Sequence, residues 1–306
     1  MRIIYGINNI KKIRNPVIAM GVFDGLHRGH RRILKAANAK AKKIGGESVA
    51  LTFYPHPQKE ESLYSLEHRL QLIAELGLDV CIVVHFSSHF SRIEAKDFVE
   101  DVLVDKIGAA FVYVGKDFRF GYKSKGNLDF LKKMGKVCNF KVRGFSIIKV
   151  RGIPISSTLI RKLIRNGDIK GAQKLLDRPV SILGTVIRGT KIGRLLGFST
   201  ANINPHHEVI PSEGIYAVRV IFGKKEFKGA CYIGTRPTVP DKLKAKGSHR
   251  RVNVEVHIFN FHKNIYGKYL EIKFVKKIRP DKKFASLAIL AKQIQKDVIC
   301  AKEILS

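Results

Sequence analysis

The chain contains no tryptophan and only four cysteines among its 306 residues. The cysteines, Cys81, Cys138, Cys231 and Cys300, are widely scattered, and none has the paired spacing of a zinc motif or a disulfide framework. This usage argues against a disulfide-stabilised secreted domain and predicts a reduced, cytoplasmic environment.

Long apolar runs are also missing. The longest runs, such as VIAMGVF at Val17–Phe23, are much shorter than the roughly 20 residues that a membrane helix needs. The first residues, MRIIYGINNIKK, lack the continuous apolar core and small-residue cleavage site of a secretion signal. Since 45% of the residues are hydrophobic, we expect a globular protein with no membrane partner.

Acidic residues are scarce, with 25 Asp and Glu against 57 Lys and Arg, which gives a formal net charge of +32. Such a charge favours polyanionic partners. The basic residues are spread through every segment, however, without the interleaved aromatic side chains of a base-stacking surface. We therefore expect nucleotide ligands and no specific nucleic-acid partner, and we keep a basic RNA- or DNA-binding module as the alternative.

The length predicts two domains, and the hydrophobic pattern changes near Arg178-Pro179. Before this point, strand-like and helix-like stretches alternate, as in a parallel α/β sheet. After it, short alternating runs separated by Gly-, Asn-, Pro- and Lys-rich turns are typical of an antiparallel barrel or sandwich. We expect an α/β domain at 1–179 and a mainly β domain at 180–306 that ends in a helix. The oligomeric state is left open.

The first chemical motif is GVFDGLHRGH, which follows the predicted strand Val17–Val22. Ligands of such sheets lie at the carboxyl ends of strands, where the next helix offers backbone donors to anions. His27 and His30 are three residues apart at the start of that helix, so both imidazoles can face one space. Gly25 and Gly29 leave room for phosphate, and the imidazoles can stabilise charge on a triphosphate. Two surface histidines in a glycine-rich turn are the alternative.

The second motif is GTVIRGTKIGRLLGFSTANI at Gly184–Ile203, in which Thr200 and Asn202 share one face of an extended segment. Their oxygens suit Mg²⁺ bound together with nucleotide phosphates. In NVEVHIFNF, Glu255 and His257 lie on the face opposite Val254 and Val256, where a carboxylate can act as a general base. A glycine-rich hairpin and a solvated strand face are the alternatives.

In its first half the sequence resembles the HxGH nucleotidyltransferases, and more specifically the bacterial bifunctional riboflavin kinase/FAD synthetase family. TFYPHP at Thr52–Pro57, VGKDFRFG at Val114–Gly121 and ISSTLIR at Ile155–Arg161 match family segments in the same order. The resemblance implies a Rossmann-like fold in which His27 and His30 are catalytic. It further implies that nucleotide is bound by Gly21, Phe23, Asp24, Gly25, Gly29, His56, Ser156, Ser157, Thr158 and Arg161, and flavin by Asp117, Phe118 and Phe120. A helix cap for either serine and core packing for the two phenylalanines remain alternatives.

The second half resembles a riboflavin kinase domain along nearly its whole length. GRLLGFSTAN, PSEGIYAV, YIGTRPT, VEVHIFNFHKNIYGKYL and IRPDKKF all match family segments. The resemblance implies that Thr200 and Asn202 bind Mg²⁺ with ATP, that Glu255 is the catalytic base, that Gly193 and Arg194 contact nucleotide, and that Arg279 lies near the flavin. Three residues depart from the pattern: Ser199 replaces a usual Pro, Tyr232 a frequent Asn and Asp281 a frequent Glu. The basic segment Asp241–Arg251 is interpreted as a solvated hairpin.

The expected function is therefore flavin-cofactor synthesis. With Mg²⁺ as cofactor and ATP as co-substrate, the second domain would phosphorylate riboflavin to FMN. The first would then adenylylate FMN to FAD and release pyrophosphate. The main rival is a single-activity adenylyltransferase with a degenerate second domain, against which the intact GFSTAN and VEVHIFNF segments argue.

Overall fold

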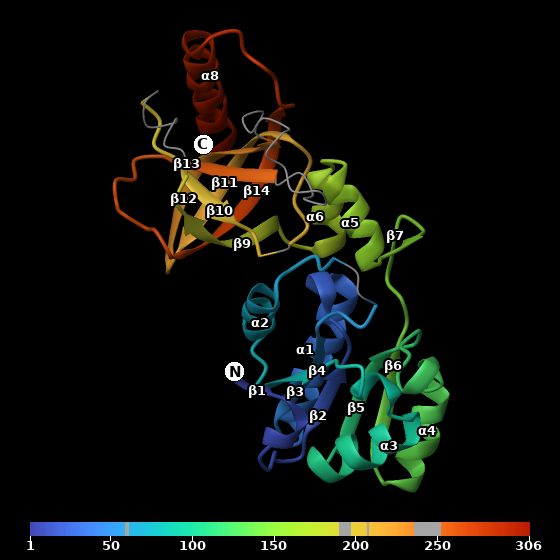
Figure 1. Ribbon diagram of the computed structural model, residues 1–306. Helices are drawn as coiled ribbons and strands as arrows, with labels where there is room; N and C mark the ends of the chain where they lie inside the picture. Colours follow the sequence, from blue (N-terminus) through green and yellow to red (C-terminus); the bar gives the residue numbers. More distant parts are fainter. Residues whose placement is uncertain (59–60, 190–196, 207, 236–251) are drawn as a thin grey trace. The chain divides into compact units, whose positions relative to one another are not determined.

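The computed structural model describes residues 1–58, 61–189, 197–206, 208–235 and 252–306. By its internal contacts the chain divides into a first unit, Met1–Ser157, and a second unit, Thr158–Ser306 (Figure 1). Each unit has its own sheet and is described separately. In the part of the chain that the structure describes, no helix is both long and apolar enough to cross a lipid bilayer.

The first unit is built on a six-stranded sheet whose strands are all parallel. The spatial order is β1-β4-β3-β2-β5-β6. The strands are β1 (Arg2–Tyr5), β2 (Val17–Met20), β3 (Ser48–Tyr54), β4 (Val80–His85), β5 (Phe111–Gly115) and β6 (Lys141–Phe145). The central strands are buried on both faces, as expected where helices cover both sides of a parallel sheet.

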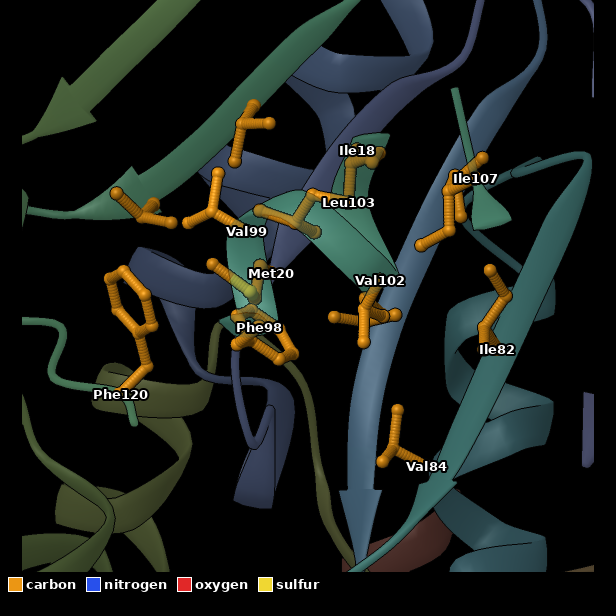
Figure 2. Packing of buried hydrophobic residues seen from close by; sticks show 14 of the residues in the cluster. Ile18, Met20, Ile82, Val84, Phe98, Val99, Val102, Leu103, Ile107 and Phe120 are labelled. Atoms are coloured by element: carbon orange, nitrogen blue, oxygen red, sulfur yellow. The ribbon is translucent and has the colours of Figure 1, made fainter. Parts of the chain in front are cut away.

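Helices cover both faces of this sheet. Helix α1 (Arg28–Lys43) packs against β2, β3 and β5 through its buried residues Ile33, Leu34, Ala37 and Ala41. On the other face, α3 (Ala95–Asp97) continues into a π-helical segment, η4 (Phe98–Lys106), and α4 (Leu128–Val137) lies on the same apolar cluster. Figure 2 shows Phe98, Val99, Val102 and Leu103 packed among strand residues such as Ile18 and Ile82. The sequence pattern predicted this helical region but not its π geometry.

The chain order across the sheet creates a switch point beside β2. From β2 the chain runs outward through β3 and β4, and it then returns to the other side of β2 to form β5. The loops after β2 and β5 therefore lead in opposite directions, and open α/β sheets generally bind ligands at such a switch point. The GVFDGLHRGH segment follows β2 at this point. The helix α2 (Leu66–Ala74) lies on the chain between β3 and β4.

The end of the first unit and the start of the second contain small elements. A two-stranded hairpin, β7 (Lys149–Val150) and β8 (Ile153–Pro154), precedes helices α5 (Ser157–Arg165) and α6 (Ile169–Leu176). Helix α6 packs on two strands of the second unit, and Gln173 Nε2 donates to the carbonyl oxygen of Phe274 at 2.9 Å. Most of α5 and all of α6 therefore group with the second unit by contacts. The domain boundary expected at residue 179 stays a prediction.

The second unit is a closed antiparallel barrel with the strand order β10-β13-β12-β11-β14-β9. Its strands are β9 (Val180–Ile187), β10 (Ala201–Asn204), β11 (Gly214–Phe222), β12 (Lys225–Thr235), β13 (Val252–Ile258) and β14 (Tyr269–Arg279). Closure depends on β10, which pairs with β9 on one side and β13 on the other. Side chains alternate along β13: Val254 and Val256 are buried, whereas Glu255 and His257 are partly exposed.

The last element, α8 (Leu287–Leu305), covers part of the barrel. Val298, Ala301 and Leu305 pack against Ala217 and Ala230 from neighbouring strands. Ser286 caps the helix, because its hydroxyl oxygen accepts from the backbone N–H of Ile289 at 3.3 Å. The α/β unit and the mainly β unit with a terminal helix confirm the expected fold classes.

Candidate active sites

The first candidate site is the turn that joins β2 to α1. Phe23, Gly25 and Leu26 have φ values of 54°, 77° and 39°, so three of the four residues in this sharp turn have positive φ. A side chain at Gly25 would also collide with Leu63. Glycine is therefore required at this position both by the backbone conformation and by the space available. The turn places His27 at the N-cap of α1.

The rings of His27 and His30 stack on one another. Their centroids are 3.7 Å apart with an interplanar angle of 21°, and Phe23 meets His30 edge-on at 5.5 Å. His27 Nδ1 accepts from the backbone N–H of His30 at 3.4 Å. Since Nδ1 is the acceptor, a neutral His27 carries its proton on Nε2. The pair thus brings a ring donor to the N-terminus of a 16-residue helix, where anions are favoured.

Burial keeps both imidazoles neutral. It lowers the pKa of His27 from 6.5 to about 4. The pKa of His30 is lowered well below its usual value by burial first, and then by the nearby His27 and Arg69. Neutral rings are donors that carry no charge of their own, so they can bind phosphate oxygens and become more basic as negative charge approaches.

The turn is held from two directions within the first unit. The buried carboxylate of Asp24 accepts from the backbone N–H of Leu63 at 2.8 Å. The carbonyl oxygen of the same residue accepts from the hydroxyl of Ser157 at 2.8 Å. Both contacts fix the loop, so the structure gives Asp24 and Ser157 a structural role beside the histidines.

Arg69 is a buried cation at this site, and sequence reasoning did not identify it. Its Nη1 donates to the carbonyl oxygen of Val22 at 2.6 Å, and to Thr52 Oγ1 and the carbonyl oxygen of Phe53 at 3.3 Å each. Thr52 Oγ1 donates to the same Val22 oxygen at 2.8 Å. Burial lowers the pKa of Arg69, while the negative charge of Asp24 acts in the opposite direction.

The other residues predicted for this site have varied surroundings. Phe120 is buried in the core of the sheet against Phe98, with centroids 5.5 Å apart, and Phe118 packs beside that core. Asp117 is exposed after β5. His56 Nδ1 accepts from the backbone N–H of Gln58 at 3.2 Å. Ser156 is exposed at the end of the first unit, whereas Thr158 and Arg161 belong to the second, so their place beside the histidines stays a prediction.

The second candidate site lies where β10, β13 and β12 are neighbours. Thr200 Oγ1 donates to Glu255 Oε2 at 3.3 Å. Asn202 and Tyr232 are the cross-strand partners of Glu255 on its two sides. The structure therefore brings together the three residues that the sequence analysis singled out, and adds Tyr232. Burial, followed by the charge of Asp281, raises the pKa of Tyr232, whose hydroxyl donates to Asp281 Oδ2 at 3.2 Å.

His257 supports the segment before β10. Its Nδ1 donates to the carbonyl oxygen of Ser199 at 2.8 Å, and its ring meets Phe198 edge-on with centroids 5.6 Å apart. This contact holds the backbone at Ser199, just before Thr200. Gly193 and Arg194 lie outside the described residues, as does the Asp241–Arg251 segment.

Arg279, at the end of β14, is held by the terminal helix. Its Nε and Nη2 donate to the two carboxylate oxygens of Asp297 at 2.9 and 2.7 Å, and its Nη1 donates to the carbonyl oxygen of Pro280 at 3.0 Å. Gln293 Nε2 also donates to Asp297 at 2.9 Å. The guanidinium lies over the ring of Phe284 at 5.6 Å. Its donors are largely used within the protein, and its place near a flavin stays a prediction.

The donor set fits Mg²⁺ held together with nucleotide phosphates. Hydroxyl, amide and carboxylate oxygens of Thr200, Asn202 and Glu255 are hard ligands, and Mg²⁺ commonly binds through one or two protein groups plus substrate phosphates. Among the described residues there is no group of three or more His, Cys, Asp or Glu arranged to hold a metal alone.

Comparison with known proteins matches a family to each part of the chain. Residues 9–159 match the FAD synthetase family, and residues 176–305 match the riboflavin kinase family. A bifunctional riboflavin kinase/FMN adenylyltransferase of Buchnera aphidicola subsp. Schizaphis graminum is 38% identical over 313 residues, covering 99% of this chain and 98% of the relative. The chain belongs to the bifunctional riboflavin kinase/FMN adenylyltransferase family.

A second relative and a solved structure also match this chain over nearly its whole length. The Escherichia coli (strain K12) protein of the same name is 34% identical, covering 99% of this chain and 97% of the relative. A crystal structure described as a macrolide-efflux protein from Streptococcus pneumoniae is 26% identical, with a TM-score of 0.83 and 97% of each chain covered. The family expected from the sequence motifs is thus confirmed.

Two residues of the FAD synthetase and riboflavin kinase regions were missed by sequence reasoning. Arg69 lies four residues before Ile73 on the buried face of α2, and Asp297 lies four before Ala301 on the buried face of α8. A charged residue at a core position of an amphipathic helix is the signal that marks both.

Proposed function

We propose that this member of the bifunctional riboflavin kinase/FMN adenylyltransferase family makes FAD in two ATP-dependent steps. The barrel of the second unit phosphorylates riboflavin to FMN, and the sheet of the first unit adenylylates FMN to FAD. The observation that carries the proposal is the presence of two separate constellations, the stacked His27/His30 pair and the Thr200–Glu255 pair, one in each family-matched region.

In the kinase step, Glu255 takes the proton from the terminal hydroxyl of the ribityl chain. The hydroxyl oxygen bonds to the γ-phosphorus of ATP as the bond to ADP breaks. Thr200 orients the carboxylate through its 3.3 Å hydrogen bond, and Asn202 faces it from the adjacent strand. Mg²⁺, held by Thr200 and Asn202, would supply positive charge to the nucleotide phosphates.

In the adenylyl-transfer step, a phosphate oxygen of FMN bonds to the α-phosphorus of ATP, and pyrophosphate leaves. No covalent enzyme intermediate is needed, because positioning and charge stabilisation carry the step. His27 and His30 donate ring N–H groups to phosphate oxygens at the N-terminus of α1. The low pKa of both rings supports this role, since their basicity rises only where phosphate charge is present.

The binding partners in this proposal are small anions and flavins, which suits a net charge of +32 without a specific nucleic-acid partner. Four unpaired cysteines support a reduced, cytoplasmic setting.

The decisive experiment incubates the protein with riboflavin, ATP and Mg²⁺ and separates the flavins over time. FMN should form first and FAD second. The variant Glu255→Gln should abolish FMN formation and leave the conversion of supplied FMN to FAD intact, while His27→Asn should do the reverse. Equal loss of both activities in either variant would refute the assignment of one step to each site.

A further inference from the structure

Arg69 is not explained by the roles proposed above. It is 1% exposed, one of the largest fully buried side chains in the described structure, and it lies on α2 rather than on the turn that carries the histidines. A buried charge costs several kcal/mol unless its environment compensates. Here the compensation comes from neutral oxygens and from the negative charge of Asp24.

The contacts of Arg69 converge on one point of the sheet. Val22 directly precedes the sharp turn, Thr52 and Phe53 belong to the neighbouring strand β3, and a single guanidinium nitrogen reaches all three. The Thr52 hydroxyl closes this group by donating to the same Val22 oxygen. The cation therefore ties the carboxyl end of β3 to the residue just before the turn.

The group of Arg69, Thr52 and Val22 is connected to the catalytic pair by covalent and packing contacts. After Val22 the chain passes through Phe23, whose ring meets His30 edge-on at 5.5 Å. The positive charge of Arg69 also contributes to the low pKa of His30. Nε and Nη2 of Arg69 have no hydrogen-bond partner among the described residues. The hydrogen bonds of the guanidinium are therefore made by Nη1, to the group of oxygens around Val22.

We propose that Arg69 is a positioning residue for adenylyl transfer. Its guanidinium fixes Val22, the residue before the turn that presents His27 and His30. This inference rests on the proposed role of the two histidines.

The test uses the full chain and measures both reactions separately, so the kinase reaction controls for intact protein. Arg69→Met should lower kcat for FMN-to-FAD conversion on the order of 10- to 100-fold with a smaller change in KM for ATP, because misplacement of reacting groups acts mainly on the chemical step. Riboflavin-to-FMN conversion should be unchanged. An unchanged kcat in Arg69→Met, or equal loss of both reactions, would overturn the proposal.

Two matched variants separate positioning from stability. Arg69→Lys keeps the positive charge but not the planar guanidinium with its several donors. This variant should keep the low pKa of His30, and its kcat for FMN-to-FAD conversion should fall several-fold. Arg69→Met should instead raise the pKa of His30, measured by NMR with histidine labelled at the ring carbons. If Arg69→Met does not fold and Arg69→Lys has the kcat of the wild type, Arg69 serves stability alone and the proposal is wrong.

His27→Asn, measured alongside, distinguishes this proposal from the one on which it rests. A wild-type rate of FAD formation in His27→Asn would refute the histidine assignment itself. A low rate in His27→Asn together with a wild-type rate in Arg69→Met would refute only the role of Arg69.

Discussion

The low pKa of His27 has a measurable consequence for stability. The group has a pKa of about 4 in the folded chain and 6.5 when it is not perturbed, so the unfolded state binds more protons between these values. The contribution of neutral His27 to the free energy of unfolding is fully present above pH 6.5 and is lost as the pH falls toward 4. The complete shift corresponds to about 3 kcal/mol, and the loss already reaches about 2 kcal/mol at pH 5.

The matched variant is His27→Asn, because asparagine is a good N-cap residue and does not titrate. We expect the wild-type chain to lose about 2 kcal/mol more than the variant between pH 7.5 and pH 5. Hydrogen exchange of peptides from β2 and α1, corrected for the pH dependence of intrinsic exchange, reports the opening free energy of the first unit separately.

An NMR titration of ring-labelled histidine checks the cause directly. The resonance that disappears in His27→Asn should titrate near pH 4, and it should move to higher pH when ATP binds, because phosphate charge favours the imidazolium. A titration near pH 6.5 without ligand, or equal pH dependence of exchange in the two proteins, would show that His27 is not held in the buried geometry described above.

Three further predictions follow from the contacts. Gly25→Ala should destabilise the first unit by about 1–3 kcal/mol and abolish FMN-to-FAD conversion, since φ is 77° and Leu63 occupies the space; unchanged kinetics would contradict this. Asp297→Ala should destabilise the second unit by about 3–5 kcal/mol by leaving Arg279 without its carboxylate, as urea unfolding would measure. Cys81, whose pKa burial raises to about 12, should stay unmodified by a thiol reagent at pH 8 while partly exposed Cys138 reacts; rapid labelling of Cys81 would contradict its burial.

The sequence predicted those elements whose hydrophobic pattern is strong. Val17–Val22 was expected as a strand and β2 covers Val17–Met20, while the helix expected from Phe284 begins at Leu287. Strand β1 was not predicted, because it has four residues and only Ile4 is buried. Strand β10 (Ala201–Asn204) was not assigned either, although Thr200 just before it and Asn202 within it were placed on an extended segment; it is four residues long with only Ile203 buried.

The candidate sites were predicted only as far as local spacing could reveal them. The three-residue spacing of His27 and His30 correctly indicated a shared space, and the alternation around Glu255 gave the correct buried face. Arg69 and Asp297 were missed because their partners, Val22 and Arg279, are 47 and 18 residues away in the chain. Such contacts depend on how elements pack, and periodicity within one element carries no record of them.

The two sheets also differ in when they can form during synthesis. All six strands of the parallel sheet end by Phe145, whereas the barrel cannot close before β14 is made, because its first strand, β9, pairs with its last. At about 5–20 residues per second, the interval from Phe145 to Arg279 takes roughly 7–27 s. The adenylyl-transfer fold can therefore be complete on the ribosome while the kinase fold is still missing a strand. On each nascent chain, the half that consumes FMN is ready before the half that supplies it.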